Sequence, residues 1–261
     1  VYLLIKRLSS QGLLYAEIRF APQLHTKCGL SQREVIAAAV DGLSRGVAEF
    51  NFAAQLILCC MRGYDNFTAN LETVQLAAEY LNKDVCALDL AGNEAAFPTS
   101  QFADIFDLAK DLSVPFTIHA GEAEGADSVK AALDLGAVRI GHGIHSVNDK
   151  QLLEQLKSTH TPLELCYTSN LQTKAANIAN YPLPTFIENG VTVTLNTDNM
   201  TVSDTTLKNE YLLIKERFSL DDEALLQLSV NAANAAFLTA DEKRQLCDRI
   251  KLSFSDWLNN K

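Results

Sequence analysis

Short apolar runs recur along the chain, and longer stretches with helical periodicity separate them. Runs of about four to eight such residues are typical of buried strands. Seven runs have this character: 14–20, 54–60, 85–90, 116–119, 138–142, 163–166 and 191–197. The pattern therefore predicts seven strands.

The segments between these runs carry the signals of helices. The clearest apolar stripe follows i, i+3, i+4, i+7 spacing and consists of Phe102, Ile105, Phe106, Ala109 and Leu112. Ser31 precedes QREVIAAAV and Asp149 precedes KQLLEQL, so each can cap a helix N-terminus with its side-chain oxygen. The first residues, VYLLIKRL, are typical of the middle of a helix. Strands that alternate with helices imply parallel pairing, because a parallel connection needs a long crossover, and they predict an α/β fold.

The polar residues at the strand ends favour a closed barrel over an open sheet. Each of the following residues comes at the carboxyl end of a different predicted strand: Arg19, Gly92, His119, His142, Ser169 and Asp198. In a closed barrel these ends meet at one active-site mouth, whereas an open sheet gathers its ligands at one switch point. We therefore expect one barrel domain over residues 1–261, with the chain after Asp198 largely helical. There, Leu225, Leu226, Ser229, Ala232, Ala233, Ala236 and Phe237 share one predicted helix face.

Composition narrows the possible partners. The chain has 261 residues, of which 48% are hydrophobic, and its 22 basic against 32 acidic residues give a net charge of −10. This acidic balance disfavours nucleic acid and anionic membranes as partners. The six cysteines show no CxxC spacing and most lie in apolar runs, which is typical of reduced thiols in a cytoplasmic protein. The amino-terminal residues do not have the pattern of a signal peptide.

The strongest chemical signal is FTIHAGEAEG, in which an apolar run ends at His119 and Glu122 follows in the loop. Neutral imidazole is a good zinc ligand, and a nearby carboxylate can shuttle protons without binding the metal. RIGHGIH places His142 at the end of the next strand, between two glycines that leave room beside the ring, and TLNTDN ends a later strand at Asp198. A lone strand-end histidine is more often structural. Two histidines and an aspartate on separate strand ends, with Glu122 in the loop after one of them, predict a hydrolytic metal site.

Other candidate residues have simpler interpretations. His145 and His160 are expected to be structural or solvent-facing, and His25 is expected in a surface loop, with a place in the pocket lining as the alternative. Glu17 and Arg19 alternate on one strand and point the same way, so Arg19 can form an internal salt bridge or contact substrate. The sequence contains no GxSxG, GxxxxGK[ST] or GxGxxG motif, so serine-hydrolase, kinase and dehydrogenase activities have no support.

Six blocks in order, YAEIRFAPQLH, LDLAGNEAAFP, FTIHAGE, RIGHGIH, LELCYTSN and VTLNTDN, resemble those of the adenosine deaminases of the metal-dependent amidohydrolase superfamily, in a bacterial-like form. The resemblance covers essentially the whole chain. It implies a (β/α)8 TIM barrel of the metallo-dependent hydrolase type with C-terminal helices. It also implies hydrolysis of adenosine and 2′-deoxyadenosine, small purine nucleosides, to inosine and ammonia in purine salvage, with one Zn²⁺ per site.

The resemblance also assigns roles to residues. His119 and Asp198 would be zinc ligands, and Asp198 would also accept a proton from the bound water. His142 would orient that water, and Glu122 would protonate the purine ring nitrogen beside the reacting carbon. These four residues would form the catalytic and metal centre.

Two further residues would bind the purine. Gly92 in LAGNE matches a glycine whose backbone donor meets the ring, although a turn requirement accounts for a glycine there equally well. Asn199 stands where many members have Asp, and its amide can donate to the nitrogen of the five-membered ring without a proton of its own.

One family feature has no counterpart in the sequence. Members carry an HxH pair of zinc ligands on the first strand, and none of the five histidines here is two residues from another. We therefore expect the first βα unit to be absent from this chain. Adenine deaminase remains an alternative, as does a catalytically inactive nucleoside-binding relative if the loss of HxH is genuine. AMP is disfavoured because no basic cluster accompanies the motifs. The oligomeric state is left open.

Overall fold

The computed structural model describes residues 1–259, and the helices and strands of this part fall into two units. The first unit comprises Val1–His119 and Ala131–Val138, and the second comprises Ala120–Lys130 and the chain from Arg139 onward. That the whole of 1–261 is one domain stays a prediction.

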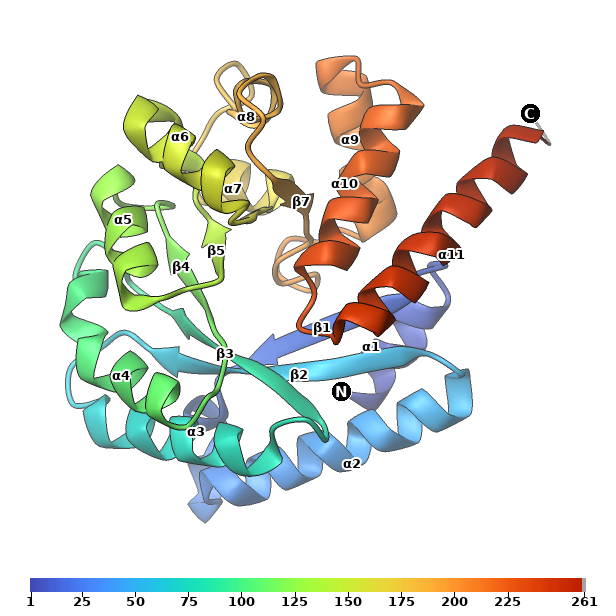
Figure 1. Ribbon diagram of the computed structural model, residues 1–261. Helices are drawn as coiled ribbons and strands as arrows, with labels where there is room; N and C mark the ends of the chain where they lie inside the picture. Colours follow the sequence, from blue (N-terminus) through green and yellow to red (C-terminus); the bar gives the residue numbers. More distant parts are fainter. Residues whose placement is uncertain (260–261) are drawn as a thin grey trace. The chain divides into compact units, whose positions relative to one another are not determined.

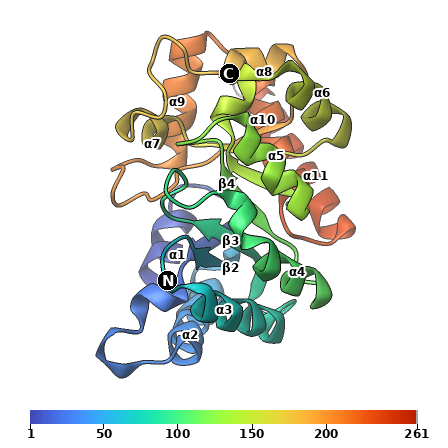
Figure 2. The ribbon, with the colours of Figure 1, turned by 90° about the vertical axis from the view of Figure 1, so that its left-hand side faces the viewer.

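The first unit contains a parallel sheet in the order β1-β2-β3. Its strands are β1 (Tyr15–Phe20), β2 (Ala53–Met61) and β3 (Val85–Ala91). Its helices are α1 (Tyr2–Ser9), α2 (Gln32–Phe50), α3 (Phe67–Tyr80) and α4 (Ala103–Asp111). Helices α2 and α3 lie along the same face of the sheet (Figure 1 and Figure 2). β3 is buried from Val85 to Leu90, which explains why its sequence is apolar at almost every position rather than alternating.

The second sheet has the order β4-β5-β6-β7, in which the pairs β5–β6 and β6–β7 are parallel. Its strands are β4 (Thr117–Ala120), which spans the boundary between the units, β5 (Arg139–His142), β6 (Leu163–Leu165) and β7 (Val193–Leu195). The helices from this part of the chain onward are α5 (Ala126–Leu135), α6 (Lys150–Thr159), α7 (Tyr167–Gln172), α8 (Leu183–Glu188), α9 (Leu207–Phe218), α10 (Asp222–Ala235) and α11 (Ala240–Asn259). Within the second unit, α10 packs on β7 and α11 packs on α10.

A buried ion pair joins β5 to β6 in the second unit. The side chains of Arg139 and Glu164 are 7% and 6% exposed, and Arg139 Nε lies 2.7 Å from Glu164 Oε1. Arg139 Nη1 donates to the carbonyl of Ala235 at 2.9 Å, and the guanidinium lies 4.0 Å from the ring centre of Phe237. The pair therefore connects two strands to the end of α10.

All seven predicted strands are present among the described residues, and six of them differ from the predicted runs only by small changes at their ends. The predicted run 191–197 is much longer than β7, so Asp198 lies three residues beyond the strand rather than at its end. The predicted stripe of α4 is buried except for Leu112, which is 39% exposed. The predicted apolar face of α10 extended too far, because the helix ends at Ala235, before Ala236 and Phe237. Among residues 1–259, no helix is long and apolar enough to span a membrane.

Both predicted N-caps are confirmed, and the cap of α2 can be tested directly. Ser31 Oγ accepts from the backbone of Glu34, and the Glu34 side chain accepts from the backbone of Ser31. Ser31→Ala is expected to lower the free energy of unfolding by about 1 kcal/mol, because a helix donor loses its partner. Urea unfolding measures this difference. Ser100→Ala, at an exposed position with no cap, is the matched control, and equal stability of the two variants would contradict the prediction.

Candidate functional site

The predicted site residues are divided between the two units. His119 and Gly92 belong to the first unit, whereas Glu122, His142 and Asp198 belong to the second, as does Asn199. Among residues 1–259, no group of three or more His, Cys, Asp or Glu side chains could hold a metal ion. The surroundings of each residue within its own unit determine what it can contribute.

In the first unit, His119 of β4 is held by a buried carboxylate on β3. His119 Nδ1 lies 3.0 Å from Asp89 Oδ1 and 2.8 Å from Oδ2, and Asp89 is fully buried. Arg19 Nη1 donates to Asp89 Oδ2 at 3.0 Å, so Arg19 forms an internal ion pair. Burial alone would raise the pKa of Asp89, but the adjacent His119 and Arg19 outweigh it and hold this pKa well below its usual range.

This contact selects one tautomer of His119. A neutral imidazole whose Nδ1 faces an ionised carboxylate carries its proton on Nδ1 and therefore presents a lone pair on Nε2. Metal-binding histidines commonly have this arrangement, because the carboxylate fixes the ring and increases its basicity. Sequence reasoning missed Asp89, although a carboxylate inside an apolar strand was an available signal.

A second buried charge fixes the backbone of His119. Arg62 is 4% exposed and follows β2 directly. Its guanidinium donates to the carbonyls of Phe97 at 2.7 Å and His119 at 2.6 Å, and to Thr99 Oγ1 at 3.0 Å. Arg62, which the sequence analysis did not single out, thus ties the end of β4 to the loop after β3.

Gly92 follows β3 and lies against Arg62. Its φ of +113° favours glycine, and a Cβ placed there would lie 3.2 Å from both the Cβ and the carbonyl oxygen of Arg62. The backbone conformation and the close approach of Arg62 therefore require glycine here, which confirms the predicted turn requirement. Its contact with a purine stays a prediction.

In the second unit, His142 ends β5 and is 2% exposed. Its φ of +59° lies in the left-handed region, where a residue with a side chain is strained by about 1–3 kcal/mol. Gly143 follows at φ +66°, and a Cβ there would lie 2.7 Å from a methyl carbon of Leu163. The space that this glycine leaves is therefore filled by Leu163.

His142 and Glu122 form a cluster with Asn170 of α7. His142 Nε2 lies 3.5 Å from Glu122 Oε2. The amide Nδ2 of Asn170 lies 3.2 Å from Glu122 Oε1 and 3.0 Å from His142 Nδ1. Thr173 Oγ1 also donates to Glu122 Oε1, at 3.2 Å. The predicted acid and the predicted water-orienting residue are therefore neighbours, and Asn170 bridges them.

Asp198 and Asn199 lie in the loop after β7, where both are exposed. Asp198 has φ +53°, and Ser169 Oγ donates to its Oδ2 at 2.6 Å. Asn199 Oδ1 accepts from the backbone N–H groups of Thr201 and Val202, each at 3.1 Å. With its oxygen held by the loop, Asn199 has its Nδ2 as the group that can donate to a ligand. Ser169 lies on α7, not at a strand end as predicted.

The other three histidines occupy ordinary positions. His25 is exposed beside Phe20, and the ring centres are 6.0 Å apart. His145 Nδ1 lies 3.0 Å from the carbonyl of Glu124. His160 is exposed and ends α6 in the left-handed conformation.

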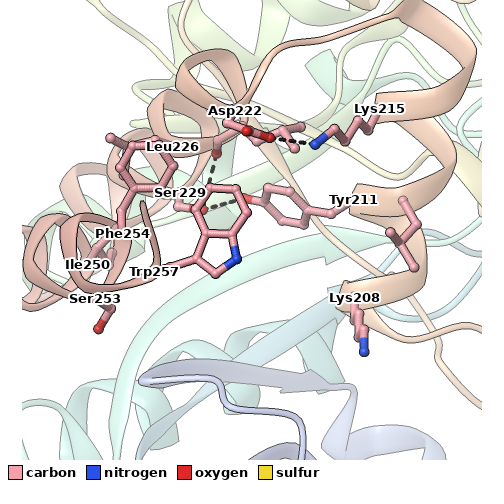
Figure 3. Close-up of a pocket in the computed structure, with 12 residues that line it drawn as sticks. Lys208, Tyr211, Lys215, Asp222, Leu226, Ser229, Ile250, Ser253, Phe254 and Trp257 are labelled. Carbon is pink, nitrogen blue, oxygen red and sulfur yellow. Dashed lines mark hydrogen bonds and ion pairs between the residues drawn. The ribbon is translucent and has the colours of Figure 1, made fainter. Parts of the chain in front are cut away.

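A separate pocket of about 420 Å³ lies between α9, α10 and α11 (Figure 3). Its wall includes the hydrogen bond between Tyr211 Oη and Ser229 Oγ, at 2.8 Å, and the ion pair between Lys215 and Asp222. Trp257 of α11 also lines it. None of the predicted site residues is among its lining residues.

Comparison with known proteins gives one consistent result. The model of the adenosine deaminase family matches residues 1–253. The adenosine deaminase of Haemophilus ducreyi is 52% identical over 253 residues, which are 95% of this chain and 74% of that protein. The adenosine deaminase of Enterococcus faecalis is 41% identical over 254 residues, covering 97% of this chain and 75% of that protein.

Solved structures also resemble the chain. A Burkhoderia ambifaria amidohydrolase with bound Zn has a TM-score of 0.93 at 19% identity, over 99% of this chain and 73% of that one. Arabidopsis ADAL complexed with IMP has a TM-score of 0.88 at 27% identity, over 98% and 76% of the two chains. The first likeness concerns the fold alone. These TIM-barrel neighbours, with the parallel strands and their helices, confirm the predicted α/β fold class.

Proposed function

The chain belongs to the adenosine deaminase family of hydrolytic enzymes, and we propose that it converts adenosine and 2′-deoxyadenosine to inosine and 2′-deoxyinosine, with ammonia as the other product. One observation carries the proposal beyond family membership. The carboxyl group of Glu122, in the loop after β4, and the imidazole of His142, at the end of β5, lie 3.5 Å apart. An acid and an orienting imidazole in this relation suit the addition of water to an aromatic ring.

We propose that the metal of this metal-dependent family is zinc, and that His119 and Asp198 would each supply one ligand, as the family resemblance implies. The donor types fit, because zinc binds imidazole nitrogen and carboxylate oxygen. The contact between Asp89 and His119 Nδ1 supports the fit, since it leaves Nε2 as the ligand nitrogen. When bound, zinc would lower the pKa of a water molecule to about 7 and so supply hydroxide at neutral pH.

The side chains of the second unit would carry the proton transfers. Glu122 would donate a proton to the purine ring nitrogen beside the reacting carbon, which makes that carbon electrophilic. His142 would orient the attacking water. Water adds to the carbon, the carbon–nitrogen bond breaks, and the amino group leaves as ammonia with a proton returned through the acid–base groups. Asp198 would accept a proton from the water, as the family resemblance implies.

Purine recognition is assigned to Gly92 and Asn199. The backbone N–H of Gly92 and the amide Nδ2 of Asn199 are both donors, and ring nitrogens are acceptors. The two contacts between Asn199 Oδ1 and backbone N–H groups support this role, because they orient the amide.

A cytoplasmic location is part of the proposal. No disulfide links the six cysteines within residues 1–259. Burial raises the pKa of the Cys59 thiol well above its usual value, so this thiol is unreactive. Buried reduced cysteines support a reducing compartment.

The ultraviolet absorbance change from adenosine to inosine tests the proposed reaction. Purified protein is assayed with and without added zinc against adenosine, 2′-deoxyadenosine, adenine and AMP at equal concentrations, with ammonia release as a second readout. Turnover of the two nucleosides in preference to adenine and AMP is expected. Preference for adenine or AMP would overturn the assigned substrate, and no turnover of any of the four by zinc-loaded protein would overturn the activity.

The role of Asp89 gives a prediction for metal binding. Asp89→Asn is expected to weaken zinc binding about 10- to 100-fold, because His119 loses the charged partner that fixes its tautomer and raises its basicity. Competition with a fluorescent chelator measures the affinity, and circular dichroism checks that the variant folds. Asp111→Asn, an exposed substitution at the end of α4, is the control. Zinc affinity equal to that of the control would contradict the assigned role of Asp89.

A further inference from the structure

Asn170 lies at the centre of the polar cluster in the second unit, although the sequence analysis did not predict it as a site residue. It lies on α7 and is fully buried. Its amide has three polar contacts: with Glu122 Oε1 at 3.2 Å, with His142 Nδ1 at 3.0 Å and with the hydroxyl of Tyr181 at 3.2 Å. These contacts satisfy the buried amide and hold it in one position between its three partners.

The partners on the two sides of the amide, Tyr181 and Glu122, determine which way it faces. Tyr181 is buried, and its ring packs edge-on against Tyr167 and stacked on Phe218. Burial raises the pKa of Tyr181 well above its usual value, so its hydroxyl stays protonated and donates to Asn170 Oδ1. The amide nitrogen then faces Glu122 and His142. The opposite orientation would place an amide oxygen against Glu122 Oε1, which is itself an acceptor and already accepts from Thr173.

This orientation determines the tautomer of His142. The two N–H groups of Asn170 Nδ2 are directed to Glu122 Oε1 and His142 Nδ1. A ring nitrogen that accepts a hydrogen bond must carry a lone pair, so the proton of neutral His142 is on Nε2. His142 Nε2, which faces Glu122 Oε2 at 3.5 Å, is therefore a donor.

The helix that carries Asn170 is itself anchored. Glu210 of α9 is fully buried, and its carboxylate accepts from the backbone N–H of Thr168 at 3.0 Å and from the Thr168 hydroxyl. Thr205 Oγ1 donates to the same carboxylate at 2.6 Å. A carboxylate at the first turn of α7 satisfies a backbone donor of the helix, which keeps Asn170 in place.

We propose that Asn170 is a positioning residue that fixes His142 in the Nε2–H tautomer and holds the Glu122 carboxyl beside it, with Tyr181 fixing Asn170 in turn. The consequence for catalysis rests on the proposed function. Nε2–H is the group with which His142 can donate to an attacking oxygen, and an Nδ1–H ring would present a lone pair there instead. The tautomer itself is a property of the free protein.

Nitrogen NMR of protein labelled with [15N]histidine tests the tautomer directly. Protonated and unprotonated ring nitrogens resonate in well-separated regions, and the signals of His142 are those lost in His142→Gln. In the wild-type protein, His142 is expected to show a protonated Nε2 and an unprotonated Nδ1. Asn170→Leu, which keeps the size but removes the donor, is expected to produce a mixture of tautomers. A protonated Nδ1 in the wild type, or an unchanged tautomer in Asn170→Leu, would overturn the proposal.

Matched variants separate this role from simple packing. Thr173→Val removes a donor to Glu122 but does not touch His142, so its His142 tautomer should equal that of the wild type. Tyr181→Phe removes only the hydroxyl that orients Asn170 and should shift the tautomer in the direction of Asn170→Leu. A changed His142 tautomer in Thr173→Val, or an unchanged one in Tyr181→Phe, would show that the tautomer does not depend on the hydrogen bonds from Tyr181 to Asn170 and from Asn170 to His142.

Steady-state kinetics with adenosine measure the consequence of the Asn170 contacts for catalysis. Asn170→Leu is expected to lower kcat about 10- to 100-fold with little change in KM, because the acid–base groups lose their alignment while purine contacts remain. Asn170→Asp should not restore kcat, since a carboxylate cannot donate to Nδ1 and repels Glu122. A wild-type value in Asn170→Leu would overturn the role in catalysis. The predicted tautomer in a protein that does not turn over adenosine would support the structural inference and contradict the proposed function.

Discussion

Glu122→Gln is expected to lower kcat for adenosine about 100- to 10,000-fold, which is the range of loss when a general acid is removed. Glutamine keeps an oxygen that can accept from Asn170 and Thr173, so the local structure should persist. It has no acidic proton to give to the purine ring nitrogen. The loss should therefore appear in kcat with little change in KM, measured by initial rates of absorbance change over a range of adenosine concentrations.

The control for this variant lies two residues along the same loop. Glu124 is exposed, and Glu124→Gln makes the same loss of charge there. Its kcat should stay within about twofold of wild type, because exposed substitutions outside a site change little. Equal losses of kcat in both variants would show that the effect comes from the negative charge of the loop and not from the acid at Glu122. A wild-type rate in Glu122→Gln would remove Glu122 from the mechanism.

Glu164→Leu is expected to lower the free energy of unfolding by about 3–5 kcal/mol. The substitution leaves the buried guanidinium of Arg139 without the carboxylate 2.7 Å away. That contact brings the charges together without a well-aligned hydrogen bond from Nε. The carbonyl of Ala235 and the ring of Phe237 remain, but neither carries a negative charge. Urea unfolding followed by circular dichroism measures the change.

The double variant Arg139→Met/Glu164→Leu distinguishes charge from packing. Replacing both partners by apolar side chains of similar size removes the unpaired charge, so much of the stability should return. If the double variant is at least as unstable as Glu164→Leu, the loss comes from the shape of the side chains and not from the buried charge.

The order of strands and helices could be predicted from the sequence because strands buried on both faces read as continuous apolar runs. The extent of β7 could not be predicted, because threonine and asparagine in TLNTDN continue the extended pattern beyond Leu195 although pairing with β6 stops there. The end of α10 was missed for a related reason. Ala236 and Phe237 continue the apolar spacing after the helix has ended, and the Phe237 ring packs on Arg139.

The motifs predict His119, Glu122, His142 and Asp198 as site residues, because short blocks around strand ends can be recognised in the sequence alone. The residues that hold them were not found. Asp89 and His119 are 30 positions apart, as are many pairs with no contact, and only the β3–β4 arrangement brings them together. Asn170 ends the block LELCYTSN, but its proposed role depends on what its amide faces, and no spacing in the sequence indicates the direction of a side chain.

Trp257 is the only tryptophan of the chain, and it lies on α11 at the pocket between α9, α10 and α11. Its side chain is in the second unit, whereas the first unit has no tryptophan. Indole emission is therefore an intrinsic optical label for one unit, while far-ultraviolet dichroism reports on the helices of both. Superimposable unfolding curves from the two signals mean that the units lose their structure together, and separated curves identify which unit melts first without any engineered probe.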